Sequence, residues 1–168
     1  MQVASRYSLH TGMASAAKMA GGVSGDTCSV VNLEHGKILM MLSDGMGSGI
    51  QAANESKMAV NFLERLMAAG FDVDIAVKTV NSMLLLRMPE ECFATVDMAV
   101  IDAFSGEAEF LKIGSAPSFV KRVREVTTIK SAALPIGILN QIEIEPVKMP
   151  LTPGNNVPDS VGDSHTRH

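Results

Sequence analysis

The sequence has few of the residues that build disulfide frameworks, zinc sites or aromatic cores. Cys28 and Cys92 are its two cysteines, and they do not form a Cys-x-x-Cys spacing. Disulfide scaffolds and zinc sites need more cysteines at closer spacing, so neither is expected. Tryptophan is absent and aromatic residues make up 4% of the chain, whereas there are 12 methionines. The core must therefore consist mainly of aliphatic side chains and methionine.

Charge and hydropathy exclude two further classes of protein. The formal net charge is −4 and no cluster of lysine and arginine occurs, so a nucleic-acid surface is not expected. The longest apolar run, 38–42, is far too short to span a bilayer. A hydrophobic content of 46% indicates a folded domain instead of a disordered chain. We expect a cytoplasmic domain, with any membrane attachment supplied by parts of a parent protein outside this chain.

Two aspartates occupy the outer ends of a predicted antiparallel hairpin. Two apolar stretches flank a Glu-His-Gly segment at 34–36. If this segment is a three-residue loop with its glycine in the left-handed conformation, Leu33 pairs with Lys37. Counting outward along that register places Asp26 directly opposite Asp44. Cross-strand neighbours have Cβ atoms about 5 Å apart, so two like charges would meet at one strand end.

A divalent cation would remove the repulsion between these two carboxylates. Mg²⁺ and Mn²⁺ prefer oxygen ligands, so the pair of Asp26 and Asp44 predicts a metal site. A loop of two or four residues would instead place the two side chains on opposite faces of the hairpin. Gly-Asp and Asp-Gly are also common turn dipeptides, so turn formation alone is the other interpretation.

The remaining periodicities predict a mixture of strands and helices. Period-two patterns predict strands over 5–13, 93–101, 107–113, 118–123, 126–129 and 142–149. Apolar stripes at helical spacing predict helices over 50–69 and 72–87. Two of the strands are apolar on both faces, which is typical of sheets covered on both sides. We therefore expect an α+β fold, a layered α-β-β-α sandwich of two antiparallel sheets covered by helices.

The composition changes after Gly154. Residues 155–168 contain two isolated valines as their only apolar residues, and they show no period. We therefore expect a domain over 1–154 and an unstructured or foreign tail over 155–168.

Several motifs carry a resemblance to a known family over roughly residues 10–154. They are Gly25-Asp26, Ser43-Asp44-Gly45-Met46-Gly47-Ser48-Gly49, Lys78–Leu84, Phe110–Phe119 and Leu134–Gly137. Together they resemble the metal-dependent PPM (PP2C-like) serine/threonine phosphatases. The sequence is most similar to the bacterial branch that dephosphorylates anti-anti-sigma factors, and within that branch to its sporulation phosphatase.

The resemblance implies a two-metal hydrolase whose metal-bound water attacks phosphoserine. In the family, the residue matching Asp44 bridges two Mn²⁺ or Mg²⁺ ions, the carbonyl matching Gly45 adds a ligand, and the residue matching Asp26 joins the site. Asp26 and Asp44 are thus the implied catalytic residues. Many relatives carry a phosphate-binding arginine just upstream of the first aspartate. This chain offers only Lys18 there, for which a loop lysine without a role in binding is the favoured interpretation. The implied partner is a phosphorylated anti-anti-sigma factor, and the implied parent is anchored at the division septum.

The chain also departs from the family pattern. Relatives continue past the position of Gly154 into a second Asp-Gly strand and a late aspartate, whereas here only Asp159 and Asp163 follow, without strand pattern. We therefore expect a phosphatase domain lacking its C-terminal part, with weak or no activity, and homodimerisation through unpaired strand edges. Two alternatives are a catalytically incomplete interaction or regulatory domain and a nucleotide-binding module built on the glycine-rich turn. The negative charge of Asp44 argues against the nucleotide.

Overall fold

The computed structural model describes residues 6–14, 24–45, 49–86, 93–131 and 133–158. In chain order, its elements are β1 (Asp26–Asn32), the short 3-10 turn η1 (Glu34–Gly36), β2 (Lys37–Asp44), α1 (Gly49–Ala68), α2 (Val73–Leu86), β3 (Val96–Asp102), β4 (Glu107–Ile113), β5 (Ser118–Lys121), β6 (Val126–Ile129) and β7 (Val147–Pro150).

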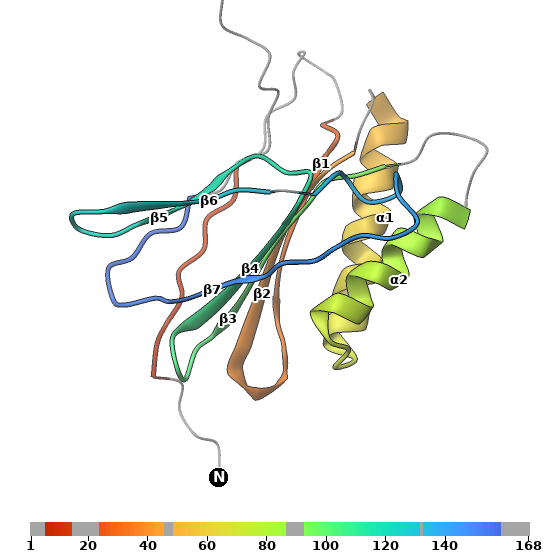
Figure 1. Cartoon of the computed structure of the whole chain (residues 1–168). Coiled ribbons are helices and arrows are strands. Elements are labelled where there is room, and N and C mark those ends of the chain that lie inside the picture. The colour runs from red at the N-terminus through yellow and green to blue at the C-terminus, as the bar shows by residue number, and fades with distance from the viewer. Residues whose placement is uncertain (1–5, 15–23, 46–48, 87–92, 132, 159–168) are drawn as a thin grey trace, which may run out of the picture.

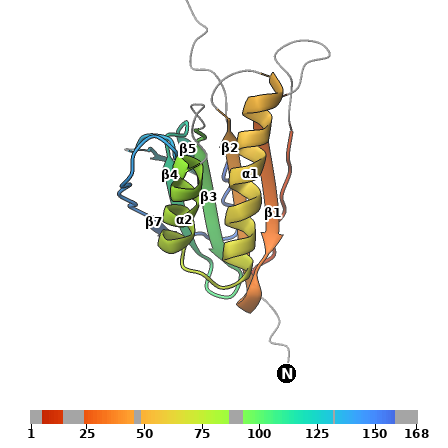
Figure 2. The same ribbon diagram turned by 90° about the vertical axis from the view of Figure 1, so that its right-hand side faces the viewer.

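The strands form two antiparallel sheets. The larger sheet has five strands in the order β1-β2-β3-β4-β7, and β5 and β6 pair as a separate hairpin. Both helices pack on one face of the larger sheet, and the β5–β6 hairpin lies on the other face (Figure 1). Turning the molecule shows α1 in front of β1 and β2 (Figure 2). The predicted α+β fold with two antiparallel sheets and two helices is confirmed.

The alternation along the central strands places apolar side chains on both faces of the sheet. Leu39 and Met41 belong to the core between the sheet and the helices. Met40 and Phe110 belong to a second cluster, on the face that the β5–β6 hairpin covers. Successive side chains of a strand point to opposite faces, so one continuous apolar run supplies both clusters. The prediction that these strands are buried on two sides is confirmed.

The two helices lie within a residue of their predicted bounds at each end. The first contributes a buried stripe of Ala59, Leu63 and Met67 to the core. It ends at Ala68, and Gly70 follows with a φ of 83°, the left-handed conformation of a helix C′ residue. No helix among the described residues is long and apolar enough to span a bilayer.

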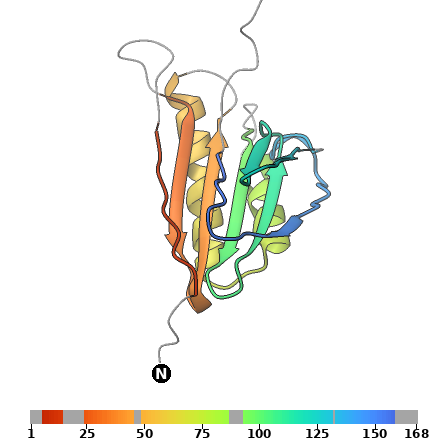
Figure 3. The same ribbon diagram turned by 90° about the vertical axis from the view of Figure 1, so that its left-hand side faces the viewer.

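Two segments predicted as strands differ in the structure. Residues 6–14 have no strand conformation and run across the sheet face turned away from the helices (Figure 3). At the other end, β7 begins at Val147 instead of 142. The apolar side chains of Ile142 and Ile144 pack against the helix-side core. β7 pairs with β4 only along residues 107–110, so residues 142–146 are not part of the strand. The period-two pattern there reflects alternate burial of side chains instead of strand pairing.

The first residues of the predicted tail lie against the β5–β6 hairpin. The Lys121 amide donates to the Asn156 carbonyl at 2.7 Å, and the Asn156 amide donates back at 3.0 Å. The amide of Phe119 donates to the carbonyl of Pro158 at 3.2 Å. Residues 155–158 therefore extend the pairing of β5, while 159–168 lie outside the described residues.

Candidate functional site at the end of the β1–β2 hairpin

The β1–β2 hairpin has the register expected from its loop. The amide of Leu33 donates to the carbonyl of Lys37 at 2.8 Å across η1, and Asp26 lies opposite Asp44. Gly36 has a φ of 68°, and an added Cβ would lie 2.4 Å from Phe104 Cε2. Two reasons therefore require glycine at position 36, the left-handed backbone conformation and the lack of space for a Cβ. The predicted three-residue loop and register are confirmed.

The hydrogen-bond pattern brings the two aspartates closer than the register alone requires. The amide of Gly45 donates to the carbonyl of Gly25 at 3.2 Å, so the hydrogen-bonded pairs of this ladder fall on either side of Asp26 and Asp44. The two aspartates form a non-hydrogen-bonded pair, in which Cα atoms are about 4.5 Å apart and side chains approach most closely. Both side chains are partly buried.

Neighbouring backbone and hydroxyl groups hold this strand end in place. The Asp44 amide donates to Thr95 Oγ1 at 2.9 Å, and the Asp44 carbonyl accepts from the Thr95 amide at 2.9 Å. Just before β1, Ser24 Oγ donates to Asp26 Oδ2 at 3.0 Å. Thr95 therefore fixes the backbone of one aspartate, and Ser24 orients the carboxylate of the other.

The remaining predicted site residues divide into two groups. Gly45 is buried, directly follows Asp44 and forms a β-bridge with Ala94. Lys18 and residues 46–48 of the glycine-rich turn lie outside the described residues. The structure thus brings Asp26, Asp44 and Gly45 together at one strand end, and their role as metal ligands remains a prediction.

A buried ion pair that the sequence analysis did not identify lies on the same sheet face. Asp97 and Lys112 are directly opposite in the β3–β4 register, and Lys112 Nζ donates to Asp97 Oδ2. Ser118 Oγ also donates to Asp97 Oδ2, at 3.0 Å. All three residues are buried. The sequence does contain a signal for this ion pair. Each of two apolar strands includes a charged residue, and charges buried in a protein are paired.

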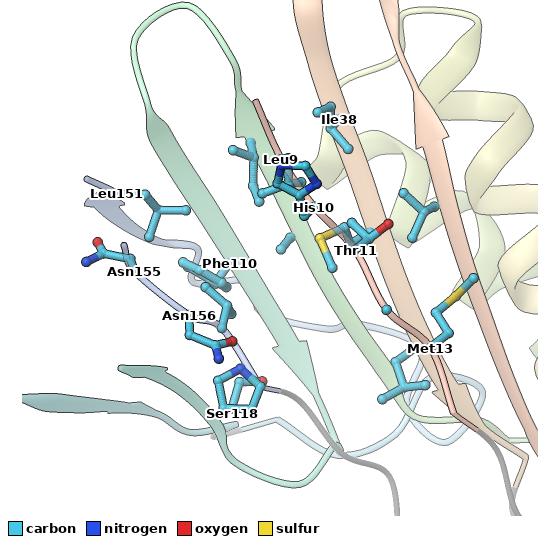
Figure 4. A pocket seen from close by; sticks show the side chains of 18 of the residues that line it. Leu9, His10, Thr11, Met13, Ile38, Phe110, Ser118, Leu151, Asn155 and Asn156 are labelled. Carbon is cyan, nitrogen blue, oxygen red and sulfur yellow. The ribbon is translucent and has the colours of Figure 1, made fainter. Parts of the chain in front are cut away.

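A cavity of about 770 Å³ lies on the sheet face turned away from the helices. Residues 7–14 and 151–158 line it together with the sheet, and apolar side chains such as Leu9, Ile38 and Phe110 form much of its wall (Figure 4). Asp26 and Asp97 are its acidic lining residues near the site, and Asp102 adds a third at the opposite strand end. Its apolar wall does not suit a phosphate dianion, so the strand end is the better candidate site.

Comparison with known proteins decides the family. A profile of the stage II sporulation protein E (SpoIIE) family matches residues 34–157. This chain belongs to the SpoIIE family. It is 42% identical over 149 residues to stage II sporulation protein E of Bacillus subtilis (strain 168), which covers 89% of this chain and 18% of that protein. The chain thus spans about a fifth of the length of this curated relative.

Solved structures agree with this assignment. The structure of the PP2C phosphatase domain with a fragment of the regulatory domain of SpoIIE from Bacillus subtilis matches with a TM-score of 0.72 at 41% identity. That match covers 79% of this chain and 39% of the other. RsbX, solved in complex with magnesium, shares the fold with a TM-score of 0.66 at 17% identity, over 82% of this chain and 70% of RsbX. The SpoIIE-family chain described here therefore has the PP2C-type phosphatase fold.

Proposed function

We propose that this chain is the metal-binding part of a phosphoserine phosphatase domain, and that Asp26 and Asp44 hold the divalent ions. The observation that carries the proposal is their placement as a non-hydrogen-bonded cross-strand pair. Two carboxylates in such a pair repel one another, which is unfavourable unless a cation lies between them. Membership of a phosphatase family supports hydrolysis of a phosphate ester as the reaction.

The residues at the strand end suit Mg²⁺ or Mn²⁺. They offer carboxylate oxygens from Asp26 and Asp44 and the backbone carbonyl of Gly45, which are the donors that both ions prefer. The magnesium in the RsbX structure supports the same class of ion in this fold. Bound ions of this class would lower the pKa of a coordinated water and neutralise charge developing on the phosphoryl oxygens.

The residues around the pair have separate tasks in this proposal. Ser24 orients the carboxylate of Asp26, and Thr95 fixes the backbone of Asp44 through two hydrogen bonds. The ion pair of Lys112 with Asp97 neutralises the third carboxylate near this end of the sheet. Divalent ions would therefore be drawn to the pair of Asp26 and Asp44 instead of to Asp97.

Within the described residues, no group of three or more histidine, cysteine, aspartate and glutamate side chains could hold a metal ion. Two carboxylates and one carbonyl leave most positions of an octahedral ion to water, so we expect the 168-residue chain to hold one ion weakly. We accordingly propose that full activity requires further parts of a longer SpoIIE-type protein. Its substrate would be a phosphorylated anti-anti-sigma factor.

Turnover of a phosphoserine protein tests the proposal. In a complete protein containing this chain, with Mn²⁺ present and absent, Asp44→Asn should lose nearly all Mn²⁺-dependent activity and Asp26→Asn most of it. Asp74→Asn is the matched control, because Asp74 is exposed on α2 and pairs with Lys78 at 2.8 Å. An Asp44→Asn protein with near-parent turnover at saturating Mn²⁺ would refute the assignment, as would robust turnover without metal.

A further inference from the structure

A buried serine on α1 reaches the backbone beside the aspartate pair. Ser56 is 0% exposed, and its Oγ lies 2.6 Å from the carbonyl oxygen of Gly25. Gly25 directly precedes Asp26, and its carbonyl also accepts the hydrogen bond from the Gly45 amide at 3.2 Å. One carbonyl oxygen therefore joins helix α1, strand β1 and the residue that follows Asp44.

Counting hydrogens assigns the direction of these bonds. A serine hydroxyl has one hydrogen to donate. The Gly25 carbonyl at 2.6 Å is closer to Ser56 Oγ than the Ala53 carbonyl at 3.2 Å, so the hydrogen is directed at Gly25. Thr27 Oγ1 lies 2.7 Å from Ser56 Oγ and then donates to it. Thr27 faces α1, whereas Asp26 lines the cavity on the opposite face, because successive side chains of a strand alternate.

Satisfying a buried hydroxyl does not by itself require this contact. Ser56 could bond within its own helix to Ala53, as serines in helices commonly do. Its shorter contact is to a residue 31 positions away, at the strand end where two carboxylates face each other. We propose that Ser56 is a positioning residue that ties the Asp26–Asp44 strand end to α1. The proposal rests on the function proposed above, since it concerns the geometry of the same pair.

Removal of the hydroxyl should loosen one end of the hairpin and leave the other end unchanged. In Ser56→Ala, the Gly25 carbonyl keeps only the longer bond from Gly45, and repulsion between the aspartates acts against it. A hydrogen bond to a buried group contributes enough stability to change local opening by about tenfold. The amide of Leu33, at the loop end of the same hairpin, should be unaffected.

Amide hydrogen exchange of the metal-free 168-residue chain, measured by NMR, tests this directly. We expect the Gly45 amide to exchange about tenfold faster in Ser56→Ala, with Leu33 within about twofold of the parent. Ser56→Cys, which keeps the shape and a weak donor, should fall between the two. The matched control is Ser131→Ala, because Ser131 Oγ donates to the Lys112 carbonyl at 3.0 Å, away from the pair. Unchanged exchange at Gly45, or equal acceleration at Gly45 and Leu33, would overturn the proposal.

Mn²⁺ titration of the same samples separates this inference from the proposed function. Paramagnetic broadening of the Asp26 and Gly45 amide signals should need more Mn²⁺, up to about tenfold, in Ser56→Ala than in the parent or in Ser131→Ala, because metal binding must then also order the strand end. A parent chain without broadening at these amides would contradict the metal site and leave the exchange result on Ser56 decisive. Equal Mn²⁺ requirements in Ser56→Ala and parent would overturn the positioning role.

Discussion

Replacement of Asp26 by asparagine should stabilise the metal-free chain. The substitution keeps the shape of the side chain and an oxygen that accepts from Ser24 Oγ, which lies 3.0 Å from Asp26 Oδ2. It removes one of two negative charges that face each other as a non-hydrogen-bonded pair. The dominant effect is therefore the loss of repulsion with Asp44.

The size of the effect follows from the spacing and burial of the pair. Like charges directly opposite on neighbouring strands are unfavourable by up to about 1 kcal/mol, in line with Coulomb repulsion at about 4 Å in a water-like environment. Asp26 is partly buried, so the upper part of this range applies. For a domain of this size, about 1 kcal/mol raises Tm by about 2–4 °C. The gain should shrink in high salt, which screens the repulsion.

Added metal should reverse the order of the two proteins. A ligand at about 100 times its Kd stabilises the folded state by about 2.7 kcal/mol, and Asp26→Asn should lose most of this gain. The assay is thermal unfolding of parent and Asp26→Asn in EDTA and in increasing Mn²⁺. Asp74→Asn is again the control, because removal of its exposed pair with Lys78 changes stability by about 0.5 kcal/mol or less and leaves the Mn²⁺ response intact. A lower Tm for Asp26→Asn in EDTA, or an undiminished Mn²⁺ shift, would refute the reasoning.

Two further predictions concern charged groups away from the pair. The backbone amides of Phe104 and Ser105 donate hydrogen bonds to Asp102 Oδ1 and hold the pKa of Asp102 below its ordinary value of 3.8. The bond from Phe104 lowers the pKa more. In urea unfolding at pH 7, Asp102→Asn should therefore be less stable than the parent. The difference in free energy of unfolding should become smaller as the pH falls below 3.8. A difference that does not change with pH would contradict this. Lys112→Met should lower the free energy of unfolding by about 3–5 kcal/mol, because Asp97 is left buried without its cation. Adding Asp97→Leu should recover most of that loss, and an equally unstable double variant would argue against charge burial as the cause.

The sequence predicted the hairpin accurately because its determinants are local. A short loop ending in glycine restricts the register to a few choices, and the apolar alternation on each side removes the others. Gly36 illustrates this, since its positive φ and its contact with Phe104 leave no room for another residue. The positions of Asp26 and Asp44 then follow by counting. The helices were equally accessible, because an amphipathic stripe and a C-terminal glycine are features of one segment.

What the sequence analysis missed has two causes. Asp97 and Lys112 face each other within one hairpin, and a charged residue inside each apolar strand was a signal, but their pairing requires the β3–β4 register. The bond from Ser56 to Gly25 joins residues 31 positions apart and requires the placement of α1 on the sheet, which no local pattern specifies. The strand predicted over 142–149 is shorter in the structure and begins at Val147, because strand pairing also depends on a partner elsewhere in the chain. Its alternation was real, but β7 pairs with β4 only along residues 107–110, and Ile113 at the far end of β4 forms a bridge with Ala133.

At the strand end of Asp26 and Asp44, the proposed metal-binding side chains and the side chains that hold the strand in place lie on opposite faces of the sheet. Asp26 lines the cavity on the open face, while its neighbour Thr27 bonds to Ser56 beneath the sheet. Because side chains alternate along a strand, a change on the helix side can move the carboxylates without contacting any group that they bind. Substitutions at Ser56 and at Asp26 should therefore be distinguishable. The first changes how firmly the pair is held, and the second changes what the pair can hold.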